Sequence, residues 1–143
     1  MITSKELELG NIVAYETETG ETTPMMKVEG ILRGKVFLVP LHGQQRAIEV
    51  PEEKLKEIPL SEKLVEKLGF RFHRILEIQR YELEKHPVYQ DRRSSCTLTF
   101  NGTRHVDVRN AGNCISDVSS LHALQKAYRN CSIFQPTLDV SAL

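Results

Sequence analysis

Short apolar runs separated by polar turns dominate the first 58 residues and predict β-strands. The runs that are rich in strand formers are residues 11–16, 25–32, 35–39 and 46–50. The last run alternates polar and apolar side chains, which is the period of a half-buried strand. Strands spaced this closely favour an antiparallel meander, and we expect it to curl into a small barrel-like sheet.

The residues around Ser61 carry the signals of a short helix with defined ends. Ser61 can accept hydrogen bonds from the free N–H groups of the first turn, and Leu60 can pack against Val65 as a hydrophobic staple. Gly69 can adopt the left-handed conformation that ends a helix, with Phe70 folding back on Val65 as in a Schellman motif. We therefore predict a short capped helix between Ser61 and Gly69.

The apolar residues of the segment 70–90 fit both the two-residue period of a strand and the 3.6-residue period of a helix. A strand face would hold Phe70, Phe72, Leu76 and Ile78, whereas a helical face would hold Phe72, Ile75, Leu76, Gln79 and Leu83. We favour a strand with a bulge, and the helix remains open as the alternative.

Two strand-like runs, residues 95–100 and 103–108, flank the pair Asn101-Gly102 and predict a β-hairpin. Asn-Gly is the preferred pair for a type I′ turn because both positions need a positive φ. Residues 110–113 are expected to form a loop.

A last helix is expected to begin at Ser116 or Asp117. Its apolar stripe would consist of Val118, Leu121, Leu124, Tyr128 and Cys131. At about 100° per residue, Gln125 falls on that stripe and His122 at its edge. We expect this amphipathic helix to pack across a sheet.

These elements together predict an α+β fold. An N-terminal β subdomain would span residues 1–58, and a C-terminal α+β subdomain would span residues 59–143, unless the two form one continuous domain. The length of 143 residues suits one ordinary domain or two very small ones.

Charge and cysteine content restrict the class of protein further. The net charge is zero, although residues 1–60 hold 7 Lys/Arg against 10 Asp/Glu and residues 61–143 hold 12 against 9. Three cysteines without a C-x-x-C pair argue against a disulfide framework and a zinc knuckle. The N-terminus lacks the pattern of a secretory signal, and no apolar run approaches the ~20 residues that cross a bilayer. We expect a cytoplasmic protein without a membrane span.

Candidate chemistry is sparse. The five histidines form no H-x-x-x-H pair, and His105 with Asp107 would supply only two metal ligands. No G-x-S-x-G elbow or glycine-rich phosphate loop is present. We expect no catalytic residues, no metal and no cofactor, and therefore a non-enzymatic protein.

A basic and aromatic stretch, residues 71–93, is the candidate for nucleic-acid contacts. The arginines that would contact phosphates are Arg71, Arg74, Arg80, Arg92 and Arg93. Phe70, Phe72, Tyr81 and Tyr89 lie among them and could stack on bases, while Glu77, Glu82, Glu84 and Asp91 cancel most of the positive field.

The predicted C-terminal helix carries a second candidate, an interaction surface formed by His122, Gln125 and Lys126. A glutamine on an apolar stripe either contacts a partner or donates and accepts hydrogen bonds within the fold, since a buried amide must be satisfied. Both interpretations remain open on the sequence.

Three stretches, residues 7–13, 58–70 and 121–128, resemble a family of small proteins from phages and mobile elements of gut bacteria. They are similar to its patterns L-R-I-G-N-W-V, I-P-L-T-E-E-x-L-x-x-L-G-F and V-H-E-L-Q-N-L-Y. The chain departs from the last pattern at Lys126, Ala127 and Arg129, where the family has Asn, Leu and Phe, and it lacks the L-T-G-x-E-L ending. The resemblance implies a small α+β protein with no assigned activity.

The functional hypothesis is accordingly an accessory protein of phage or mobile-element type that binds a protein partner of unknown identity. The alternative is a nucleic-acid-binding module that uses residues 71–93.

Overall fold

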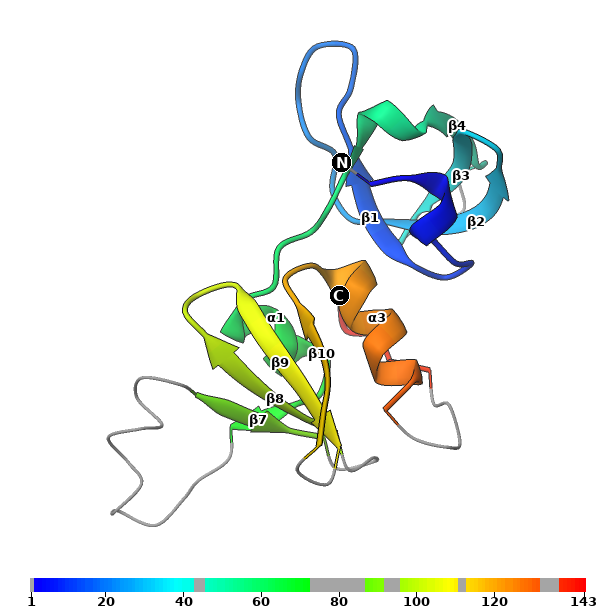
Figure 1. Cartoon of the computed structure of the whole chain (residues 1–143). Helices are drawn as coiled ribbons and strands as arrows, with labels where there is room; N and C mark the ends of the chain where they lie inside the picture. The colour runs from blue at the N-terminus through cyan, green and yellow to red at the C-terminus, as the bar shows by residue number, and fades with distance from the viewer. Residues whose placement is uncertain (1, 43–45, 73–86, 92–95, 111–112, 132–136) are drawn as a thin grey trace, which may run out of the picture. The chain divides into compact units, whose positions relative to one another are not determined.

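The computed structural model describes residues 2–42, 46–72, 87–91, 96–110, 113–131 and 137–143. The chain divides into two compact units, Met1–Ile58 and Pro59–Leu143, each with its own antiparallel sheet (Figure 1). The fold class is α+β, as predicted, and rich in strands. Most of the segment 70–90, for which we favoured a bulged strand, lies outside the described residues.

The unit Met1–Ile58 is a five-stranded sheet in the order β4-β3-β2-β1-β5, curled into a half-barrel (Figure 1). Its strands are β1 (Ile12–Tyr15), β2 (Met26–Leu32), β3 (Lys35–Pro40), β4 (Ile48–Pro51) and β5 (Leu55–Lys56). Two 3₁₀ helices, η1 (Ser4–Glu6) and η2 (Glu52–Lys54), complete it. The predicted antiparallel meander is confirmed, while β5 and both 3₁₀ helices had no signal that we recognised.

The core of this unit comes from alternating strand positions. Met26 and Val28 on β2 are buried, as are Val36 and Leu38 on β3. Their apolar neighbours in the same cluster are Ile2, Leu7, Val13, Val50 and Leu55. A bulge between Val28 and Gly30 shifts the register of β2 against β3, and bulges increase the local bend that curls a sheet.

The unit Pro59–Leu143 has a second sheet in the order β10-β9-β8-β7-β6. Its elements are α1 (Glu62–Lys67), β6 (Arg71–Phe72), β7 (Val88–Gln90), β8 (Cys96–Asn101), β9 (His105–Asn110), β10 (Asn113–Val118) and α3 (Leu121–Arg129). In Figure 1, α3 lies beside β10. Buried rings connect the elements: Phe70 meets Tyr128 edge to face at 6.0 Å, and Tyr89 meets Phe100 at 5.6 Å.

The helix α1 forms with the predicted caps. The N–H of Leu64 donates to Ser61 Oγ at 3.1 Å. At the other end, Gly69 has a φ of 97°, and the N–H of Phe70 donates to the carbonyl of Val65 at 3.1 Å. Together with the bond from the Gly69 N–H to the Glu66 carbonyl, these contacts form a Schellman motif.

The β8–β9 hairpin is present, but its turn differs from the predicted one. Asn101 pairs with His105, so the loop holds three residues instead of the two of a type I′ turn. This register places Phe100 opposite Val106 and Leu98 opposite Val108, and all four side chains are buried. A two-residue turn would change the pairing by an odd number of residues and place these side chains opposite polar ones.

The C-terminal helix begins five residues later than Ser116, and the predicted start was wrong. Residues Asn113–Val118 form β10, and Val118 pairs with Val106 instead of joining a helical stripe. Pairing with the preceding strand, β9, overrides the local capping signals of Ser116 and Asp117. Ser120 is the N-cap residue of α3. The predicted loop at 110–113 was too long, because Asn110 ends β9 and Asn113 begins β10.

Candidate binding site

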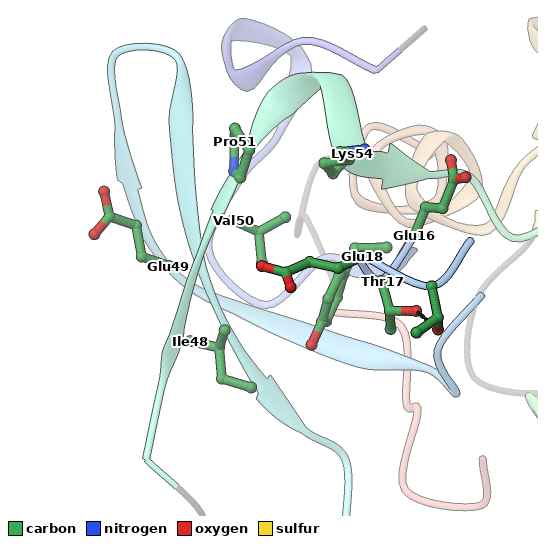
Figure 2. A pocket seen from close by; sticks show the side chains of 10 residues that line it. Glu16, Thr17, Glu18, Ile48, Glu49, Val50, Pro51 and Lys54 are labelled. Carbon is green, nitrogen blue, oxygen red and sulfur yellow. Dashed lines mark hydrogen bonds between the residues drawn. The ribbon is translucent and has the colours of Figure 1, made fainter. Parts of the chain in front are cut away.

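A hollow of about 520 Å³ opens in the half-barrel between the edge strand β4 and the chain that follows β1. Residues 15–19, residues 48–51 and Lys54 line it, and we call it the β4 hollow (Figure 2). It lies entirely within Met1–Ile58. Its volume falls in the range of about 300–1,000 Å³ that is typical of ligand sites.

The apolar part of the β4 hollow comes from Tyr15, Ile48, Val50 and Pro51. Val50 is buried, but Ile48 keeps 40% of its surface exposed. Ile48 and Val50 lie on the same face of β4, the side on which Figure 2 shows Glu18, whereas Glu49 points the other way. An exposed aliphatic side chain beside a buried one extends the core surface to solvent, where a partner can cover it.

Three carboxylates and one ammonium group complete the lining. Glu49 pairs with Lys35 at 2.8 Å, and Glu16 pairs with Lys56 at 3.5 Å. The exposed Glu18 has no ion pair within the part of the chain that the structure describes. Glu18 is therefore the lining carboxylate that makes no ion pair among the described residues, although Lys54 lines the same hollow.

Backbone hydrogen bonds fix the wall opposite β4. The N–H of Glu16 donates to the carbonyl of Lys54 at 2.8 Å, and the N–H of Thr17 donates to the carbonyl of Glu21 at 2.8 Å. The hydroxyls of Thr17 and Thr19 are 2.9 Å apart and hydrogen-bonded. The side chain of Glu18 thus extends from a segment that is anchored on both sides, and its position costs little further ordering on binding.

The lining of the β4 hollow combines apolar, hydroxyl, carboxylate and ammonium side chains. None of the described residues that line it is a cysteine, serine or histidine, so a Ser–His or Cys–His pair is not formed by them. Across the described ranges, no group of three or more His, Cys, Asp or Glu side chains is placed to hold a metal ion. Apolar surface with a few polar groups at its rim instead fits recognition.

The structure describes only one of the five arginines predicted to contact nucleic acid. Arg71 is exposed on β6, next to Phe72, which keeps 46% of its surface exposed. Arg74, Arg80, Arg92 and Arg93 lie outside the described residues. Arg71 also lines a second hollow of about 170 Å³ with Asp91 and Tyr128, which is below the size of most ligand sites.

The predicted surface on the last helix has uneven exposure. At about 100° per residue, His122, Gln125 and Lys126 share one side of α3. His122 is buried, with 7% of its surface exposed, Gln125 is half-buried and Lys126 is exposed. The apolar face of α3 is formed by Leu121, Leu124, Ala127 and Tyr128, so Gln125 lies at its edge and not at its centre.

The thiols of Cys96 and Cys131 are buried. Burial raises the pKa of both Cys96 and Cys131 above the ordinary value of a thiol. The Sγ of Cys131 donates to the carbonyl of Arg109 at 3.7 Å. Because the thiolate is the reactive form, neither group is prepared to act as a nucleophile.

The β4 hollow could not be predicted from the sequence pattern. The alternation in residues 46–50 indicated that Ile48 and Val50 share a face, but not that this face meets residues 15–19. Glu16, Glu18 and Glu21 alternate with threonine or glycine in the sequence, and nothing in that pattern indicates proximity to residues 48–51. Only the pairing of strands brings the two segments together.

No family model, curated protein or solved structure matches the chain. No helix among the described residues is both long and apolar enough to cross a membrane.

Proposed function

We propose that the protein acts by binding a protein partner, without catalysing a reaction, and that the β4 hollow is the binding site. The observation that carries this proposal is the ligand-sized hollow itself, with exposed Ile48 on its apolar wall and Glu18 at its rim. A partially exposed apolar surface with a charged rim is the usual composition of a protein interface.

The proposed biological setting is that of an accessory protein of a phage or mobile element. This part rests on the three stretches that resemble the mobile-element family. Their apolar residues include Val13, Leu64 and Leu124, all of which are buried. A resemblance carried by core residues supports a shared fold more than a shared partner, so the binding proposal stands on the hollow and not on the resemblance.

The test is affinity capture from host-cell lysate with nuclease present, comparing Ile48→Glu with Leu32→Glu. Leu32 is a matched control because it is an exposed aliphatic residue of the same sheet, with 57% of its surface exposed, and it does not line the hollow. We expect the wild-type protein and Leu32→Glu to retain the same partner. Ile48→Glu should lose most of it, because a carboxylate would be buried in the apolar contact.

Circular dichroism and thermal unfolding of both variants establish that they are folded. Equal capture by Ile48→Glu and the wild type would contradict the hollow as the site. Complete loss of captured material on nuclease treatment would contradict a protein partner.

Nucleic-acid binding is the second candidate, favoured by Arg71 and Phe72, two exposed consecutive residues of β6 whose side chains point to opposite faces of the strand. The arginine can contact a phosphate, and the ring can stack on a base. Binding of this kind weakens steeply as salt rises, whereas apolar contacts at the β4 hollow do not. A salt titration of the captured complex separates the two candidates.

A further inference from the structure

We propose that the occupant of the β4 hollow is an extended segment of the partner that carries a lysine or arginine, and that it pairs with the free edge of β4. This inference rests on the proposed function and specifies the chemistry of the partner. It follows from the edge of the sheet, the apolar wall and the charge of Glu18.

The backbone of β4 has a free edge. Within the described residues β4 pairs with β3 alone, and it is the last strand of its sheet. The N–H of Glu52 donates to the carbonyl of Gly34 at 3.1 Å, which continues the β3–β4 register by one pair. Hydrogen-bonded and non-hydrogen-bonded pairs alternate along an antiparallel ladder. The backbone groups of Ile48 and Val50 therefore point toward β3, and those of Glu49 and Pro51 point outward.

This arrangement leaves two groups of β4 for a new strand, the N–H and the carbonyl of Glu49, because the carbonyl of Pro51, the N-cap residue of η2, accepts the first hydrogen bond of that 3₁₀ helix. Pro51 has no N–H, and a proline is tolerated at an outward-facing position of an edge strand because no ladder bond is lost there. A strand that adds to an exposed edge gains its affinity from such main-chain bonds and its specificity from alternate side chains.

The side chains of an added strand would alternate in the same way as those of β4. Residues opposite Ile48 and Val50 would point to the face of the hollow, where an apolar side chain can cover Ile48. A neighbouring cationic side chain on that face can reach Glu18, whose charge has no ion pair among the described residues. The unit Met1–Ile58 also holds 7 Lys/Arg against 10 Asp/Glu, so its field favours a cation over an anion.

The probe is the capped peptide Thr-Lys-Thr-Val-Thr-Lys-Thr, titrated into the whole protein and followed by amide NMR shifts. Two matched peptides serve as controls: one with Glu in place of Lys, and one with every threonine N-methylated, so that the backbone edge that would face β4 cannot donate. The protein variants are Glu18→Lys and Glu21→Lys, which carry the same charge change. Glu21 is an exposed residue of the same β1–β2 connection and does not line the hollow.

We expect shifts centred on residues 15–19 and 48–51 and slowed exchange of the Glu49 amide. Glu18→Lys should weaken binding about three- to tenfold, in keeping with a partly screened charge contact, and Glu21→Lys by less than about twofold. The Glu-containing and N-methylated peptides should each bind at least about tenfold more weakly. Equal binding of the Lys and Glu peptides, or shifts confined to Pro59–Leu143, would overturn the inference.

Failure of this inference can be told apart from failure of the proposed function. If Ile48→Glu loses the captured partner while the Lys peptide does not bind, the hollow remains the site and the cationic strand is wrong. If Ile48→Glu keeps the partner, the proposed function itself is wrong.

Discussion

Buried ionisable side chains in Pro59–Leu143 couple its stability to alkaline pH. The thiols of Cys96 and Cys131 interact, and burial raises the pKa of each above the ordinary value of 9.0. Burial raises the pKa of Tyr89 above 10.0, and the hydrogen bond that its hydroxyl donates to Glu62 at 2.8 Å adds to this effect. All three groups therefore favour the protonated, neutral form in the folded state.

Because these pKa values are raised in the folded state, the free energy of unfolding falls at alkaline pH. Below about pH 7.5 the groups are protonated in both states and contribute no pH dependence. As pH rises further, the unfolded chain releases protons that the folded chain retains, so the free energy of unfolding falls, by at most about 1.4 kcal/mol per pH unit for each group.

We predict that the wild-type protein loses stability to urea between neutral pH and about pH 10. The variant Cys96→Ala should lose less over the same interval. A variant that loses as much as the wild type would show that the buried thiol is not responsible.

At the scale of elements, substitutions in the β8–β9 turn can test whether its loop holds three residues or two. Gly102 has a φ of 86°, with no atom within 4 Å of a Cβ built there. Gly102→Ala should therefore lower the free energy of unfolding by about 1 kcal/mol through backbone strain alone.

Asn101 occupies a strand position, and its side-chain amide donates to Asp107 at 2.6 Å on an exposed surface. Asn101→Ala should cost less than Gly102→Ala, because only an exposed hydrogen bond is lost. In a two-residue type I′ turn both positions would need a positive φ, and the two substitutions would cost about the same. Urea unfolding of both variants distinguishes the registers.

The helix α1 carries its own local signals and could be predicted from the sequence. The strand β10 depends on pairing with another strand and could not. Ser61 and Gly69 define α1 within a few residues of chain, so its caps could be predicted directly. Ser116 and Asp117 carried an equally plausible local signal for a helix start, but pairing of β10 with β9 decided their structure. The partners of β10 lie on the preceding strand, as for Val118 and Val106, and a helical pattern along one segment does not include them.

At the scale of the whole molecule, the two units differ in what they offer a partner. Met1–Ile58 has an open half-barrel with the β4 hollow and an excess of acidic side chains. Pro59–Leu143 has an excess of basic side chains, 12 Lys/Arg against 9 Asp/Glu, and an exposed pair, Arg71 and Phe72. The predictions made from sequence favoured α3 and residues 71–93 for binding, both in the second unit. The site that we propose, the β4 hollow, lies instead in the first unit, Met1–Ile58.

The most direct test of this account is amide hydrogen exchange of the protein bound to its captured, nuclease-treated partner, compared with the free protein. Exchange reports residue by residue where a partner protects the backbone. If the partner binds at the β4 hollow, exchange slows at residues 15–19 and 48–50, with the largest change at the outward-facing amide of Glu49. Protection confined to β6 or to α3 would contradict this site and would indicate a binding site in the unit Pro59–Leu143.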